Sequence, residues 1–258
     1  MLRVGTSGYS YAEWRGPFYP AGLPPRAMLP FYAQHFRAVE VNASYYRIPT
    51  PDQARRMAAR AGGGLDFAIK AHRDLTHERE RWADALPAFR AALTPFAEAG
   101  TLGAVLLQFP HAFHHTPENR DHLAALREAL PGLPLVAEFR NRGWFNERTY
   151  ALLRELRLGL CCVDAPPLPT LPPPVCLATS AVGYVRFHGR NAAAWWHHAT
   201  AAERYTYAYR PEELAPWVPR LRRLAAETER CYAFFNNHAR GQAALDAKQL
   251  LALLQDST

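Results

Sequence analysis

The sequence predicts an α/β protein built as one (β/α)8 barrel of the TIM type, a single domain over residues 1–258. Segments typical of strands and of helices alternate along the chain, and about eight such pairs in roughly 250 residues is the size of this barrel. The main rival, an open doubly wound sheet, places a Gly-x-Gly-x-x-Gly turn after its first strand. The turn here reads Gly5-Thr6-Ser7-Gly8 and does not fit. Polar residues also follow the ends of most strands, where such barrels hold their sites.

Each expected strand is a short apolar run, often with polar residues at every second position. In chain order, the strands are expected at Arg3–Thr6, Ala38–Asn42, Asp66–Lys70, Gly103–Phe109, the start of Val136–Phe145, Gly159–Val163, Gly183–His188 and Cys231–Asn236. The fifth strand combines a carboxylate and a guanidinium in an apolar setting. Because a strand alternates its faces, Glu138 and Arg140 point the same way, with Leu135, Ala137 and Phe139 on the opposite face.

Helices are expected after most strands, with Pro and Gly marking their ends. They are expected at Arg26–Phe36, from Pro49–Pro51 to Ala61, at Leu86–Ala99, Asn119–Leu130, Asn146–Leu156, Glu212–Glu229 and Gln242–Leu254. Asn146 is the expected N-cap of its helix, and two prolines interrupt the start of 212–229. The proline-rich stretch Pro166–Pro174 predicts a short or missing crossover helix after the sixth strand. Arg190–Arg210 is expected to form a long aromatic loop.

Composition favours a globular protein with a sizeable core, because 49% of the residues are hydrophobic and 21% are charged. No apolar run is long enough to span a bilayer, and the N-terminus enters a strand without the apolar region of a signal peptide. We therefore expect a cytoplasmic protein that does not bind membranes. The cysteines lack Cys-x-x-Cys spacing and are expected to be reduced core thiols rather than zinc ligands. They are Cys161, Cys162, Cys176 and Cys231.

The basic charge of the chain permits an anionic partner. The formal net charge is +7 and the sequence pI is about 9.4, which suits a phosphate ester or a nucleic acid. Nearly all basic residues are Arg, however, and the only lysines are Lys70 and Lys248. Part of the Arg excess therefore resembles the codon bias of a GC-rich genome. No feature of the sequence indicates an oligomeric state.

Polar side chains are expected to gather inside the barrel at the C-terminal ends of seven strands. Apolar neighbours such as Val39 and Val41 face outward, which leaves the polar residues beside them facing inward. In chain order the inward set is Glu40, Asn42, Lys70, His72, Gln108, Glu138, Arg140, Asp164, Arg186, His188, Asn236 and His238. Each residue alone is more often a structural hydrogen-bonding group. Their convergence at one rim predicts a functional pocket.

Seven segments resemble signature blocks of the YecE-like proteins (domain of unknown function 72). They read GTSGYSYAEWRG, FRAVEVNASYYRIP, FAIKAHRDLTH, LLQFP, VAEFRNRGWF, YVRFHGRN and FFNNHARGQAALDAKQL. The resemblance covers nearly the whole chain and implies a TIM barrel with a cleft at the C-terminal ends of its strands. It implies no reaction. His238 departs from the small polar residue common at its place in the family, so Asn236 is the stronger site residue.

Four residues of the rim are the candidate catalytic groups. Lys70 is a retained amine in an Arg-rich chain, and an amine, unlike Arg, can form a Schiff base or act as acid or base; the alternative is a salt bridge to Glu40 or Glu138. Glu138 and Asp164 lie at adjacent strand ends, and paired carboxylates can divide acid and base roles. His188 is a candidate general base, because the reference pKa of His lies near neutrality. Its alternative is a structural hydrogen bond to Asp164.

The arginines of the rim favour an anionic ligand over a metal ion. Arg140, Arg186 and Arg190 suit a phosphate or carboxylate, which Arg binds with two parallel hydrogen bonds. We expect no cofactor, and a divalent metal held by the carboxylates and histidines is the less favoured alternative. The aromatic loop, with Trp195 and Trp196, can stack a sugar or base, or pack as a lid or a dimer contact. The expected substrate contacts are Glu40, Asn42, Tyr45, His72, Gln108, Arg140, Trp144, Arg186, Arg190 and Asn236.

These features favour an enzyme that acts on a small anionic substrate, such as a sugar phosphate. The second hypothesis is a protein that binds nucleic acid or processes phosphodiesters, with or without a metal. It predicts an affinity for DNA or RNA that falls steeply with salt. The third is a ligand sensor without catalysis, which differs from the first only in lacking turnover.

Overall fold

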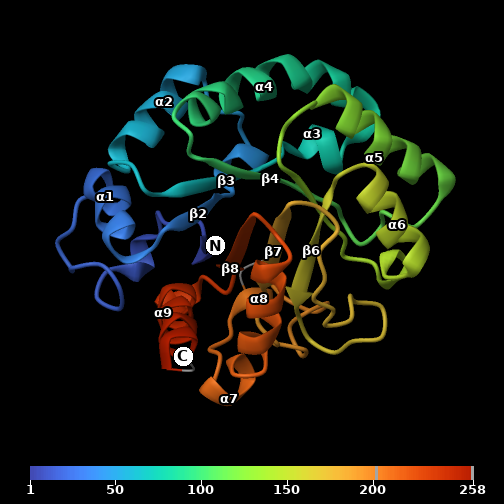
Figure 1. Ribbon diagram of the computed structural model, residues 1–258. Coiled ribbons are helices and arrows are strands. Elements are labelled where there is room, and N and C mark those ends of the chain that lie inside the picture. Colours follow the sequence, from blue (N-terminus) through green and yellow to red (C-terminus); the bar gives the residue numbers. More distant parts are fainter. Residues whose placement is uncertain (201–202, 257–258) are drawn as a thin grey trace.

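A computed structural model describes residues 1–200 and 203–256 and shows a closed barrel of eight parallel strands in chain order (Figure 1). β1 pairs with both β2 and β8, which closes the ring. This arrangement confirms the predicted (β/α)8 barrel, and every predicted strand is present with ends that agree within a few residues. The strands are β1 Leu2–Ser7, β2 Ala38–Val41, β3 Asp66–Lys70, β4 Leu102–Gln108, β5 Leu135–Glu138, β6 Gly159–Asp164, β7 Val182–Phe187 and β8 Arg230–Phe235.

Helices surround the barrel except between β6 and β7, where residues 165–181 form none, as the prolines predict (Figure 1). Two details differ from the prediction. The short α3 was not expected, and α4 begins at Trp82, four residues before the expected start. Among the described residues no helix combines the length and the apolar character needed to cross a membrane. The helices are α1 Pro25–His35, α2 Pro51–Arg60, α3 Arg73–Thr76, α4 Trp82–Glu98, α5 Pro117–Ala129, α6 Glu147–Glu155, α7 Pro211–Leu214, α8 Trp217–Ala226 and α9 Gln242–Asp256.

Local sequence explains where the helices begin and end. The Asn146 side chain accepts a hydrogen bond from the Thr149 N–H at 3.0 Å, so this residue is the N-cap of α6, as predicted. Such a cap satisfies one of the N–H groups that the first turn of a helix leaves unpaired. Ala215 and Pro216 separate α7 from α8, which confirms the predicted interruption at Pro216, whereas Pro219, the second expected break, lies in the first turn of α8.

Two apolar layers hold the barrel together. The larger layer lies between the strands and the helices and includes Leu135, Ala137 and Phe139. The smaller layer fills the barrel interior with Ala38, Ala68, Ala104, Leu106, Val136, Cys161, Val163, Val182, Tyr184, Tyr232 and Phe234. In β5, Leu135 and Ala137 therefore face the helices and Val136 faces the interior, as the alternation predicts. A network of charged side chains lies toward the C-terminal ends of the strands, whereas Arg3 and Asp66 form an ion pair near the opposite ends, where the Tyr232 hydroxyl donates to Asp66.

Candidate functional site

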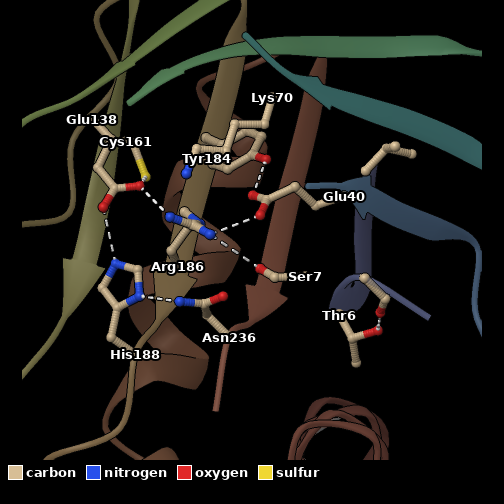
Figure 2. Close-up of polar contacts among 12 residues, drawn as sticks. Thr6, Ser7, Glu40, Lys70, Glu138, Cys161, Tyr184, Arg186, His188 and Asn236 are labelled. Carbon is tan, nitrogen blue, oxygen red and sulfur yellow. Dashed lines mark hydrogen bonds and ion pairs between the residues drawn. The ribbon is translucent and has the colours of Figure 1, made fainter. Parts of the chain in front are cut away.

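Arg186 of β7 lies at the centre of a charged network inside the barrel (Figure 2). Its Nη1 donates to Glu138 Oε2 at 2.6 Å, and its Nη2 donates to Glu40 Oε1 at 2.7 Å. The same Nη2 reaches Ser7 Oγ at 3.3 Å, and the Tyr184 hydroxyl donates to Glu40 Oε2 at 2.7 Å. Both carboxylates are fully buried, and Arg186 is 2% exposed. One guanidinium thus joins two carboxylates from opposite sides of the barrel.

This pairing makes the buried charges tolerable, because an isolated ion in the interior costs several kcal/mol. Although burial alone lowers the pKa of Arg186, Glu138 and Glu40 hold it well above its ordinary value. Burial raises the pKa of Glu138, but Arg140 and Arg186 outweigh it and hold this pKa well below the usual range. Both Nη atoms of Arg186 are occupied by the carboxylates. Arg186 therefore pairs with protein carboxylates, and its role as an anchor of a ligand anion stays a prediction.

His188, which directly follows β7, links Glu138 to Asn236 through hydrogen bonds and so orients the carboxylate (Figure 2). The His188 ring Nε2 is 3.0 Å from Glu138 Oε1, and its Nδ1 is 3.2 Å from Asn236 Nδ2. The carboxylate needs a donor and the amide nitrogen is one, so Nε2 carries the proton and Nδ1 accepts. Burial and the nearby Arg140 lower the pKa of His188 to about 3. His188 is thus neutral, and its base nitrogen is already hydrogen-bonded.

Lys70 ends β3 beside this network without an ion pair of its own. Its Nζ lies 4.2 Å from the centroid of the Tyr45 ring. In the described part of the chain no salt bridge or hydrogen bond to a carboxylate reaches it, so the alternative of a pair with Glu40 or Glu138 is not observed. Burial and the nearby Arg186 lower the pKa of Lys70 to about 7. The side chain is an amine that is partly neutral near neutral pH.

A cavity of about 200 Å³ lies over the rim of the barrel. Its lining residues are His77, Gln108, Pro110, His111, Arg140, Leu171, Trp195, Trp196, Arg204 and Tyr205. Arg140 Nε is 2.5 Å from Glu138 Oε1, so this residue connects the cavity with the buried network. Gln108 also lines the cavity, and its Nε2 donates to the Phe109 carbonyl at 2.7 Å.

Tyr205 comes from the aromatic loop and lines this cavity together with Arg140. Burial raises the pKa of a phenol, yet Arg140, Arg186 and Arg204 lower the pKa of Tyr205 below its ordinary value. Arg204 is held by the same loop, because its Nε donates to the Trp195 carbonyl at 2.9 Å. The cationic character of the cavity therefore reaches the loop that covers it.

Asp164 does not join Glu138, contrary to the expected carboxylate pair. Its neighbours Cys161 and Val163 face the barrel interior, so Asp164 points outward. There its carboxylate accepts from Arg190 at 2.7 and 2.9 Å, and from the Tyr209 hydroxyl and Trp217 Nε1. The backbone oxygen of Asp164 accepts from the His188 N–H, but no side-chain bond joins these two residues. Arg190, predicted as a substrate contact, is held by this carboxylate away from the cavity.

Four further predicted contacts lie outside the cavity. Trp144 is fully buried outside the barrel, where it stacks on Phe139 and donates to the Phe113 carbonyl, so it is a core residue and not a cleft wall. His72 caps α3, and Asn42 begins the short helix Ala43–Tyr45. Tyr45 contacts Lys70. No group of three or more His, Cys, Asp or Glu side chains in the described ranges is arranged to hold a metal ion.

Sequence reasoning missed several residues of the site. Tyr184 and Ser7 belong to the buried network, and Tyr184 shares a strand face with Arg186, so the alternation could have found it. Arg204 and Tyr205 were noted only as members of the aromatic loop. His77 follows α3 and lines the cavity. Burial and the nearby Lys70 lower the pKa of His77 to about 4. No sequence signal indicated that these loop residues return to the rim.

Comparison with known proteins gives matches over nearly the whole chain. A family model described as "Protein of unknown function DUF72" matches residues 3–258. The UPF0759 protein YunF of Bacillus subtilis (strain 168) is 29% identical over 274 residues, which cover 98% of this chain and 95% of YunF. A DUF72 family protein from Thermotoga maritima MSB8 has a TM-score of 0.91 and 34% identity, with 99% of each chain covered. One from Enterococcus faecalis V583 has a TM-score of 0.86 and 27% identity, covering 99% of this chain and 96% of that one.

Proposed function

Because this chain belongs to the DUF72 family, whose description names no activity, we propose a function from the geometry of its rim. The protein is an enzyme that binds a small carbonyl compound bearing a phosphate or carboxylate, and Lys70 is the reacting amine. The compound sits in the cationic cavity at the C-terminal ends of the strands. Lys70 does not line this cavity; it lies next to it, close enough to the lining residue His77 to lower that residue's pKa. The free thiols of its cysteines suit a cytoplasmic location, where disulfides are rare.

The unpaired Lys70 is the observation that carries this proposal. Two buried carboxylates, Glu40 and Glu138, already face two guanidiniums, Arg186 and Arg140. A third cation would exceed the negative charge of the two carboxylates. Burial and the nearby Arg186 accordingly lower the pKa of Lys70 to about 7. A desolvated amine beside other cations is the usual form of a lysine nucleophile. Arg at position 70 would stay protonated and could not react.

Arg140 and Arg204 are the anion anchors in this proposal. Both line the cavity, and Gln108 adds a polar contact. The cavity volume of about 200 Å³ is below the roughly 300–1,000 Å³ of sites for drug-sized ligands. This size favours a metabolite of a few carbon atoms over a polymer.

The proposed reaction begins with the neutral Lys70 amine, which attacks the carbonyl carbon and forms a carbinolamine. Loss of the carbinolamine hydroxyl as water leaves a Schiff base, and this step needs a proton. Tyr205 supplies that proton, because Arg140 and Arg204 stabilise the phenolate that forms. Glu138 and His188 position Arg140 and are not in contact with the substrate.

The small number of lysines allows a direct test with pyridoxal 5′-phosphate, an aldehyde that carries a phosphate. The protein is incubated with this probe, reduced with borohydride and digested, and the modified lysine is identified by mass spectrometry. We expect modification of Lys70 over Lys248, at a rate that rises with pH through about 7. Pyridoxal without its phosphate is the matched probe and is expected to react more slowly, because it lacks the anion.

Two variants distinguish the contribution of the Lys70 amine to labelling from that of the Arg140 anion anchor. Lys70→Met should lose the modification, and Arg140→Met should keep Lys70 while losing the advantage of the phosphorylated probe. Equal labelling of Lys70 and Lys248, or no dependence on the phosphate, would contradict the proposal. A sensor would bind the probe but turn over no carbonyl substrate, so an assay of small phosphorylated aldehydes and ketones completes the test.

A further inference from the structure

Two thiols lie against each other on the outer side of β6. Cys162 belongs to β6, and Cys176 belongs to the segment that replaces the crossover helix. Cys162 Sγ lies 3.7 Å from the carbonyl oxygen of Leu177, the neighbour of Cys176, which brings the two side chains together. The two thiols interact, since each shifts the pKa of the other. Both cysteines pack in the same apolar layer outside the barrel.

The two thiols differ in burial and in pKa, so one can react first with an oxidant and the other can then attack it. Cys162 is fully buried, and its interaction with Cys176 together with burial raises its pKa well above the ordinary value. Cys176 is partly exposed, and the interaction with Cys162 lowers its pKa, helped by Arg223 and Arg220. Its Sγ is 3.6 Å from the Arg220 carbonyl oxygen, which places it against α8. Cys176 is therefore the thiol that forms a thiolate and meets solvent.

We propose that Cys162 and Cys176 form a reversible disulfide when the protein meets a peroxide. The Cys176 thiolate attacks one oxygen of hydrogen peroxide, the O–O bond breaks, and the protonated leaving oxygen departs as water. The Cys162 sulfur then attacks the sulfenic acid of Cys176, and the S–S bond forms as a second water leaves. In total the two thiols lose two protons and two electrons, and the peroxide gains them as it is reduced to two molecules of water.

The disulfide would join the two ends of residues 163–175, a stretch that borders the cavity. Leu171 lines the cavity, and the Thr170 carbonyl accepts from the Arg142 N–H at 3.0 Å. A covalent tie at Cys176 restrains this wall. An effect on ligand binding rests on the proposed function, whereas formation of the disulfide does not, so the two are tested separately.

Peptide mapping tests the disulfide in the wild-type protein. The protein is treated with hydrogen peroxide, its remaining thiols are alkylated under denaturing conditions, and a digest without reductant is analysed by mass spectrometry. We expect a cross-linked peptide pair that contains Cys162 and Cys176 and that dithiothreitol separates. Cys161 and Cys231 should be recovered alkylated, because burial raises the pKa of both thiols.

Matched variants complete the test. Cys176→Ser should abolish the cross-link and leave Cys162 free, whereas Cys231→Ser should leave the cross-link unchanged. A cross-link between Cys176 and Cys231 in the wild type, or recovery of Cys176 as sulfinic acid beside a free Cys162, would overturn the proposal. Because the wild-type map decides the question, a variant that folds poorly does not obscure it. Labelling of Lys70 by pyridoxal 5′-phosphate before and after oxidation then measures any effect on the cavity.

Discussion

Among single residues, Arg186 balances the charge inside the barrel, because its two Nη atoms bind Glu138 and Glu40. Arg186→Met keeps most of the side-chain volume and removes the charge. The variant leaves two carboxylates buried with too few partners, so we expect a loss of about 3–5 kcal/mol in the free energy of unfolding. Urea denaturation at neutral pH measures this loss.

A second substitution separates charge from packing at Arg186. If unpaired carboxylates cause the loss, Glu138→Gln added to Arg186→Met should recover part of the stability that the single variant lost. Arg55→Met, which breaks an exposed pair with Asp52, should change stability little. Failure of Glu138→Gln to recover any stability would assign the loss to packing instead.

Lys70 is expected to lower stability, as residues kept for reactivity often do. The unfolded chain keeps Lys70 protonated up to its ordinary pKa of 10.5, and the folded protein releases the proton at about 7. The stability of the wild type therefore carries the full cost of the charge below pH 7 and rises with pH between these values. Lys70→Met should thus stabilise the protein by on the order of 2 kcal/mol at or below pH 7, after allowance for solvent screening. The gain should shrink as the pH approaches 10.5.

Urea denaturation at mildly acidic and at alkaline pH tests this expectation. Lys248→Met, a change at an exposed lysine of α9, is the matched control and should show no comparable trend. An equal effect of Lys70→Met at both pH values would mean that the charge of Lys70 has no cost in the folded protein.

At the scale of elements, Asp164 fixes the aromatic loop to β6 and α8. Its carboxylate accepts hydrogen bonds from Arg190, Tyr209 and Trp217. Asp164→Asn replaces one acceptor oxygen with a donor, so half of these bonds cannot form. We expect a loss of about 2 kcal/mol in stability and faster amide hydrogen exchange in residues 190–200 and 203–210. Exchange measured by mass spectrometry, with Trp217→Phe as the variant that loses one donor, checks this role.

A loss of stability without faster exchange in the loop would contradict the anchoring role of Asp164.

The inward orientation that the sequence predicted for Asp164 was wrong for a physical reason. Strand β6 reads Gly-Leu-Cys-Cys-Val before Asp164 and is buried on both faces, as strands of parallel sheets are. Such a run carries no alternation that would show which face is inside. β5 and β7 alternate apolar and charged residues, so the orientation of Glu138 and Arg186 could be predicted.

For the whole molecule, the barrel was predictable because alternating strands and helices of this number leave few other closed arrangements. The charged residues of the network, Glu40, Glu138 and Arg186, were also predictable, since each follows an apolar neighbour near a strand end, whereas Ser7 and Tyr184 were missed. Their pairing was not. Arg186 meets Glu40 across the interior, and that contact depends on barrel closure, which local patterns do not encode. Loop residues such as Tyr205 were beyond prediction, because their return to the rim depends on the anchor at Asp164.

Histidines with lowered pKa values, chiefly the buried His188 and the half-buried His77, set the response of the whole molecule to acid. Burial lowers the pKa values of His35, His115 and His122 in the same direction. Burial and neighbouring cations lower the pKa of His188 to about 3 and of His77 to about 4. The unfolded chain binds these protons below about pH 6.5, so it holds more protons than the folded protein as the pH falls, and stability decreases. Glu138, with its depressed pKa, adds to this loss below its ordinary pKa of 4.5. Asp246 opposes the loss between about pH 6 and its ordinary 3.8, because burial raises its pKa to about 6.

Two histidines outweigh one aspartate, so the free energy of unfolding should fall by on the order of 3 kcal/mol from about pH 6.5 to about pH 4. Urea denaturation across this range measures the slope. His77→Gln removes one of the two groups and should make the slope distinctly shallower, whereas exposed His197→Gln should leave it unchanged. A flat profile in the wild type would mean that the barrel interior admits protons or water at no cost. The low pKa values of His188 and His77 would then be wrong.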